Sequence, residues 1–162
     1  MPDKSLIPNY NIETILDMYG NMLFRLCIII LGNSNDAEDV IQETLIKYIQ
    51  KAPAFKNIEH EKAWLITVAT NKCRDILRFK KRYPMIDINE IKEFTKDTSD
   101  SGILDLLKTL PDKFRIVLIL YYVEGYKIED IASIIGKTKS AVKMRLQKGR
   151  RLLRELYQKE CM

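Results

Sequence analysis

The chain contains few of the residues that build metal sites or disulfide frameworks. It has 3 cysteines, Cys27, Cys73 and Cys161, with no CxxC pair among them, and His60 is its only histidine. A structural zinc site, a disulfide scaffold and a bound cofactor are therefore not expected. Cysteine usage of this kind is typical of the reducing cytoplasm, where we expect the protein to reside.

Long apolar runs and export signals are also missing. The most apolar stretch, Leu26–Leu31, is far shorter than the roughly 20 residues of a membrane span, and Arg25 precedes it directly. The N-terminus lacks the basic segment, apolar stretch and cleavage site of a secretory signal. We predict that the apolar run belongs to a protein core and that the chain inserts into no membrane.

Helical periodicity is present along most of the chain. Apolar residues recur at i, i+3 and i+4 spacing over residues 12–30, 37–49 and 63–77, and again from about Ile103 onward. Ser34, Asn35 and Asp36 offer N-caps for the second of these helices. No alternating strand pattern of useful length occurs, so the predicted fold class is all-α.

The segment from Tyr126 to Leu156 predicts two helices joined by a tight turn. Gly136 can adopt the positive φ that ends a helix, and Thr138 can cap the helix that follows. This pattern is typical of a helix-turn-helix. From Lys137 to Arg154 every charged residue is basic, which indicates a DNA phosphate partner. An ordinary basic surface helix is the alternative interpretation.

Two further charged surfaces are predicted in the first half of the chain. The second helix carries a polar face of Asp36, Asp39, Gln42 and Glu43, which favours docking to another protein over metal binding, because no histidine lies nearby. The third helix ends in a basic cluster that exceeds what the helix dipole requires and favours a second nucleic-acid contact. That cluster contains Lys72, Arg74, Arg78, Lys80, Lys81 and Arg82.

An acidic segment follows Pro84 and divides the chain. Between Tyr83 and Asp105 acids outnumber lysines, and the segment is too long for a simple connection within a compact domain. We therefore predict two small helical domains, residues 1–83 and 103–162, joined by a flexible acidic linker at 84–102.

The order of these segments resembles the extracytoplasmic-function sigma factors of bacterial RNA polymerase, within the sigma-70 family. The likeness is carried by DAEDVIQETLIKYI, AWLITVATNKCRDILR, LPDKFRIVLILYYVEGYKIEDIA and IGKTKSAVKMRLQKGRRLLREL, which together span almost the whole chain. The resemblance implies a non-catalytic subunit that binds core RNA polymerase through its beta and beta-prime subunits and directs it to promoters. Such proteins act in stress or envelope responses, usually under an anti-sigma factor.

The resemblance also assigns roles to individual residues. The first domain would bind the polymerase clamp through Asp36, Asp39, Gln42 and Glu43 and would melt the minus-ten element, whereas the second would recognise the minus-thirty-five element. The minus-ten contacts implied are Phe55, Lys56, Asn57, Asn71, Lys72, Arg74, Arg78, Lys80 and Arg82. The minus-thirty-five contacts implied are Lys139, Lys143, Met144, Arg145, Gln147, Lys148 and Arg151.

Several alternatives stay open at this stage. Phe55 can either stack on an unpaired base or pack beneath its loop, and Trp64 is expected in the core. The linker resembles a segment that the family threads toward the RNA exit path, but an acidic linker also extends by self-repulsion alone. A stand-alone dimeric helix-turn-helix regulator is the alternative function, and a small nuclease is a weaker one because no catalytic constellation is present.

Overall fold

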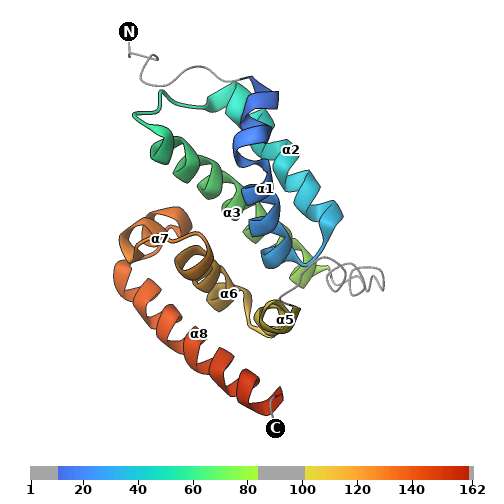
Figure 1. The fold of residues 1–162 in the computed structure, drawn as a ribbon, viewed down its shortest axis with the longest axis vertical. Coiled ribbons are helices and arrows are strands. Elements are labelled where there is room, and N and C mark those ends of the chain that lie inside the picture. Colours follow the sequence, from blue (N-terminus) through green and yellow to red (C-terminus); the bar gives the residue numbers. More distant parts are fainter. Residues whose placement is uncertain (1–10, 84–100, 161–162) are drawn as a thin grey trace.

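The computed structural model describes residues 11–83 and 101–160, and within these ranges the chain is helical and contains no strand (Figure 1). The first half consists of α1 (Ile12–Leu31), α2 (Ser34–Lys51) and α3 (Ile58–Arg82). The second half consists of α5 (Ser101–Thr109), α6 (Asp112–Leu118), the π-helical turn η1 (Ile119–Val123), α7 (Ile128–Ile135) and α8 (Lys139–Glu160). The predicted all-α fold class is confirmed. Of the predicted linker, residues 84–100 lie outside the described ranges, and residues 101 and 102 already belong to α5.

Helix α1 forms much of the core of the first half. The Asn11 side chain caps it by accepting a hydrogen bond from the Thr14 amide at 2.9 Å, and Gly32 ends it with a φ of 71°. Helix α1 is long and apolar enough to cross a membrane, but the buried core helix of a globular protein meets the same criteria of length and composition. Its buried face contacts α2 and α3, and Ile15 and Leu26 are fully buried there.

Helices α2 and α3 each begin at an asparagine cap. Asn33 accepts from the Asp36 amide at 2.9 Å, and Asn57 accepts from the His60 amide at 2.7 Å. The cap of α2 is thus Asn33, not one of the three residues after it as the sequence predicted. The extended backbone at Asn33 lets its side chain reach back over the first turn, so that Ser34 is already helical.

The two halves share one hydrophobic core. A single cluster of buried side chains joins Leu26 of α1 and Cys73 of α3 to Ile116 of α6 and Ile131 of α7. Helix α3 lies beside α7, and the C-terminal end of α1 lies near α5 and α6 (Figure 1). The helical regions that the sequence assigned to separate domains are therefore packed against each other.

A buried carboxylate links the three helices of the first half. Glu61 of α3 has no exposed surface, and its two oxygens accept hydrogen bonds from Tyr19 of α1 at 2.9 Å and Tyr48 of α2 at 2.8 Å. A buried carboxylate is tolerated only when donors of this kind replace water. Glu61 therefore holds α1 and α2 at a defined position relative to α3.

Helix α8 approaches α6 closely at Gly149, in the second half of the chain. A Cβ atom at this position would lie 3.2 Å from Leu118 Cδ1 and 3.3 Å from Phe114 Cβ. Gly149 is itself buried in the middle of α8, where glycine costs about 1 kcal/mol relative to alanine. The close contact between α6 and α8 explains why a glycine is present.

We expect Gly149→Leu to lower the free energy of unfolding by about 1–3 kcal/mol, because a large side chain cannot enter this contact without displacing α6. Urea denaturation followed by circular dichroism measures the effect. Gly102→Leu is the matched control, since Gly102 has open space around its Cβ position. Equal free energies of unfolding for the two variants would show that the packing of α8 against α6 does not require a glycine at position 149.

Candidate nucleic-acid interface

Helices α7 and α8 form the predicted helix-turn-helix. Gly136 ends α7 with a φ of 67°, and the Lys137 amide donates to the Ala132 carbonyl at 3.0 Å. The Thr138 hydroxyl then accepts from the Ala141 amide at 3.1 Å at the start of α8. The roles predicted for Gly136 and Thr138 are both confirmed, because local geometry alone determines them.

Helix α8 buries one face and exposes a basic one. Val142 and Leu146 are buried in the shared hydrophobic core. The predicted minus-thirty-five contacts Lys139, Lys143, Met144, Gln147, Lys148 and Arg151 are exposed, and Arg145 is half-buried. Lys139 lies 3.6 Å from Glu129 of α7, and the Lys148 ammonium lies 5.6 Å from the centre of the Phe114 ring. The exposed face is therefore mostly cationic and accessible.

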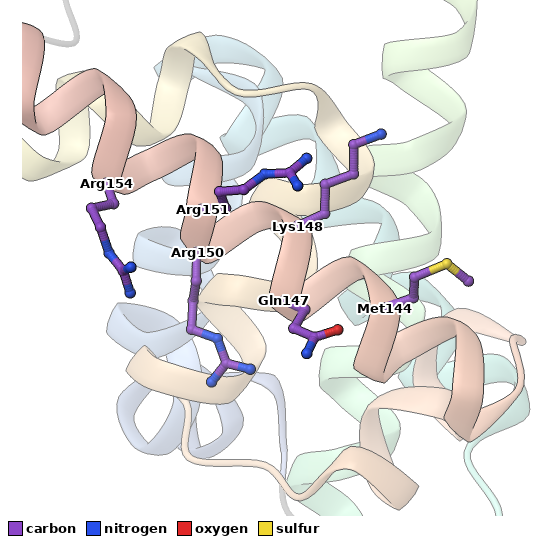
Figure 2. Close-up of a pocket in the computed structure, with 6 residues that line it drawn as sticks. All are labelled: Met144, Gln147, Lys148, Arg150, Arg151 and Arg154. Carbon is purple, nitrogen blue, oxygen red and sulfur yellow. The ribbon is translucent and has the colours of Figure 1, made fainter.

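A hollow of about 530 Å³ follows this face, and Figure 2 shows the six side chains that project around it. Its lining residues are Met144, Gln147, Lys148, Arg150, Arg151 and Arg154. Arg150 and Arg154 belong to the basic run but were not among the predicted contacts. Arg150 donates to the Tyr122 hydroxyl at 2.9 Å, which fixes its guanidinium at the edge of the hollow.

The predicted minus-ten cations on α3 lie directly beside the predicted polymerase-binding acids on α2. Lys72 pairs with Glu43 at 2.6 Å, and Lys80 pairs with Asp36 at 2.6 Å. The hydrogen bond to Glu43 raises the pKa of Lys72 above its ordinary value. The acidic face and the basic face thus meet along the α2–α3 contact.

Most of the other predicted residues on the acidic face of α2 and the basic face of α3 are exposed to solvent, but Arg74 is not. Asp39 and Gln42 are exposed on α2, as are Asn71, Arg78 and Arg82 on α3. Arg78 lies 3.8 Å from Asp75, one turn earlier on α3. Arg74 points the other way and donates to the Ile135 carbonyl of α7 at 2.8 Å, so the guanidinium predicted to contact DNA is engaged by the helix-turn-helix.

The loop before α3 holds the predicted base-contacting residues. Phe55 is 5% exposed and packs among Tyr48, His60 and Trp64, with ring centres 6.1, 5.3 and 5.8 Å away. The structure therefore shows Phe55 in the packed position that the sequence left open as an alternative. Lys56 and Asn57 are exposed, although the Asn57 oxygen is used to cap α3. Trp64 is half-buried in this aromatic cluster.

A second hollow, which the sequence did not predict, lies between α5, η1 and α8. It measures about 430 Å³ and is almost wholly apolar. Leu106, Leu118 and Leu153 contribute to its lining, with Arg150 and Arg154 also present there. No group of three or more potential metal ligands occurs in residues 11–83 and 101–160.

The fold and these surfaces define a two-region helical DNA-binding protein, with a helix-turn-helix in one region and a basic helix beside an acidic face in the other. Residues 15–83 match sigma-70 region 2, and residues 101–153 match sigma-70 region 4. The chain belongs to the sigma-70 family. It is a sigma factor, which directs RNA polymerase to promoters as a non-enzymatic initiation factor.

Relatives of known function cover most of the chain. It is 29% identical over 141 residues to the RNA polymerase sigma factor SigV of Bacillus subtilis, covering 85% of each protein. It is 30% identical over 131 residues to the sigma factor CarQ of Myxococcus xanthus, covering 74% of each. The fold is similar to that of the sigma factor RpoE, solved in complex with the anti-sigma factor NepR from Bartonella quintana. That match has a TM-score of 0.69 and 24% identity, and covers 90% of this chain and 96% of the other.

Proposed function

We propose that the protein divides promoter recognition between its two regions. Residues 1–83 bind core polymerase and the minus-ten element, residues 84–102 connect the regions, and residues 103–162 recognise the minus-thirty-five element. This division is supported by the two basic surfaces of the chain, one on α8 and one on α3. The basic surface of α3 lies beside the acidic face of α2, with which it forms two ion pairs.

The acidic face of α2 is the proposed contact with the beta-prime subunit of core polymerase. Asp39, Gln42 and Glu43 are exposed, and Asp36 is half-buried at the edge of the face. Charged faces of this kind steer a partner of opposite sign and fix the orientation of the complex. A basic partner surface would compete with Lys72 and Lys80 for these carboxylates.

The loop and the basic end of α3 are the proposed minus-ten surface. Lys56, Arg78 and Arg82 are exposed cations that suit phosphate oxygens, and Asn71 has an exposed amide that suits a base edge. Stacking of a flipped base on Phe55 would require its ring to leave the cluster with Tyr48 and Trp64. We therefore propose that Lys56 and Asn71 make the first contacts in this region.

In the second region, α8 is the proposed recognition helix of the minus-thirty-five element. Lys143 can donate to guanine acceptors, and Gln147 can form two hydrogen bonds to adenine. Arg151 lies further along the exposed face and suits the phosphate backbone. Base contacts determine sequence preference, whereas phosphate contacts determine overall affinity.

Lys143→Ala is expected to weaken binding to the cognate promoter by about 5- to 150-fold, which corresponds to about 1–3 kcal/mol for a base contact, and to affect unrelated promoters much less. Arg151→Ala should instead weaken all promoters alike and reduce the salt slope of log K by about 1. Fluorescence anisotropy of the polymerase complex over a promoter panel and several salt concentrations measures both effects. Equal losses from the two variants across the panel would contradict the assigned roles.

Regulation by an anti-sigma factor is also proposed. Similar folds occur in RpoE solved with the anti-sigma factor NepR and in CnrH solved with the cytosolic domain of CnrY. A cytoplasmic location is proposed as well, since core polymerase and promoter DNA are the partners. The apolar hollow between α5, η1 and α8 is a surface on which a protein partner of this kind could dock.

A further inference from the structure

Arg150 continues the row of proposed base-contacting side chains along α8. Four long polar side chains recur every three or four residues and so share one face of the helix. They are Lys143, Gln147, Arg150 and Arg154. Figure 2 shows the last three on the same side of α8.

The place of Arg150 along α8 suits the edge of the major groove. At 1.5 Å per residue, it lies about 10 Å beyond Lys143 along the helix axis, a distance similar to the ~8.5 Å depth of the groove. The start of a recognition helix contacts base edges. When Lys143 does so, Arg150 is therefore placed near the phosphates that border the groove.

The Arg150 guanidinium is held by a hydroxyl from another element. Its Nη1 donates a hydrogen bond to the Tyr122 Oη of η1 at 2.9 Å. This bond uses one of the five N–H donors of a guanidinium, and Arg150 is exposed to solvent, so a second acceptor can bind the same group. A phosphate suits this requirement, because it accepts paired hydrogen bonds from arginine.

The position of Tyr122 follows from the packing of α6 and η1 against α8. Leu118, one turn before Tyr122, lies against Gly149, where a Cβ atom would be 3.2 Å from Leu118 Cδ1. Because Gly149 directly precedes Arg150, this close approach brings the tyrosine within reach of the guanidinium. The Tyr121 ring also restrains the Tyr122 ring in an edge contact, with ring centres 4.9 Å apart and planes at 76°.

The hydrogen bond between Arg150 and Tyr122 contributes little to folding itself. Tyr122 is 57% exposed, so both groups could bond to water instead. What the bond does restrict is the freedom of the guanidinium. A long side chain loses this freedom on binding at a cost in affinity, and Tyr122 imposes part of that order in advance.

We propose that Arg150 contacts a phosphate of promoter DNA and that Tyr122 is its positioning residue. Tyr122 holds the guanidinium near the groove edge before DNA arrives, so that less side-chain freedom is lost on binding. The inference rests on the proposed role of α8 in recognising the minus-thirty-five element and adds a contact outside the predicted set. Because a phosphate carries no base identity, the contact strengthens binding to every promoter.

Fluorescence anisotropy of labelled promoter DNA, with the full chain bound to core polymerase, tests the proposal. We expect Arg150→Ala to weaken binding about tenfold or more on every promoter and to reduce the salt slope of log K by about 1. Tyr122→Phe should weaken binding about three- to tenfold with little change in slope, because the charge stays while its positioning is lost. Urea denaturation should show that Tyr122→Phe is as stable as the wild type.

A double-mutant cycle shows whether the hydroxyl acts through Arg150. In an Arg150→Ala background, Tyr122→Phe should cause no further loss of affinity, since no guanidinium remains to be positioned. In an Arg154→Ala background, which is the matched control, Tyr122→Phe should keep its full effect. An equal loss from Tyr122→Phe in both backgrounds would overturn the proposal, because the hydroxyl would then act through general packing.

Lys143→Ala and Arg151→Ala in the same assay separate this proposal from the proposed role of α8. If both weaken binding while Arg150→Ala leaves it unchanged, the phosphate contact of Arg150 is refuted and α8 stays the recognition helix. If none of the three variants weakens binding, α8 does not contact the promoter and both proposals fail.

Discussion

Replacing both Asp39 and Glu43 with arginine should abolish association with core polymerase, with at least a ~100-fold loss of affinity, or about 2.7 kcal/mol. Both side chains are exposed on α2, and reversing their charge places like charges against the basic surface expected on the partner. The fold should survive, because the Glu43–Lys72 pair is exposed and pairs of this kind contribute at most about 1 kcal/mol. Co-purification with core polymerase and circular dichroism measure the two quantities.

A control with the same change in net charge shows whether position matters. Glu13→Arg with Asp17→Arg alters two exposed acids of α1, away from the acidic face of α2. This pair should retain polymerase binding. Association that survives in the α2 variant, or an equal loss from the α1 variant, would remove α2 as the docking surface.

Replacing Glu61 with leucine should lower the free energy of unfolding by about 2–5 kcal/mol, since it removes the carboxylate acceptor from one buried and one partly buried hydroxyl, and each such loss costs about 1–3 kcal/mol. The hydroxyls belong to Tyr19 and Tyr48, on the two helices that Glu61 connects. Urea denaturation measures the change. A loss of this size is a large share of the 5–15 kcal/mol that stabilises a typical domain.

The matching tyrosine variants show that the loss comes from the hydrogen bonds. Tyr19→Phe and Tyr48→Phe, added to Glu61→Leu, remove the hydroxyls that lost their acceptor and should recover a substantial part of the stability. The contradicting result is a triple variant whose loss in free energy of unfolding equals the sum of the losses of the three single variants. The instability of Glu61→Leu would then come from altered packing and not from the lost hydrogen bonds.

The helix-turn-helix could be predicted because its signals are local. Gly136 and Thr138 act within a few residues of their own positions, and the basic run of α8 is visible without knowledge of the fold. The asparagine cap of α2 was missed by one position, since several capping residues stand side by side there. Short-range chemistry of this kind predicts helices well and their first residues less well.

The contacts between the two halves could not be predicted in the same way. Arg115 lies within an apolar run, and its partner carbonyl at Ile30 is far away in the sequence. Arg74 belongs to a run of similar cations, and periodicity does not distinguish it from Arg78 or Lys80. Only the packing of α3 against α7 shows that this one cation is engaged by the other region.

Run-off transcription with the purified protein, core polymerase that lacks any sigma subunit and fragments of the source genome as templates shows whether the chain directs initiation at specific promoters. We predict specific transcripts that begin downstream of a shared two-part motif, and Lys143→Ala should change which promoters are used. The contradicting result is an absence of transcripts from a protein that binds palindromic DNA alone as a dimer.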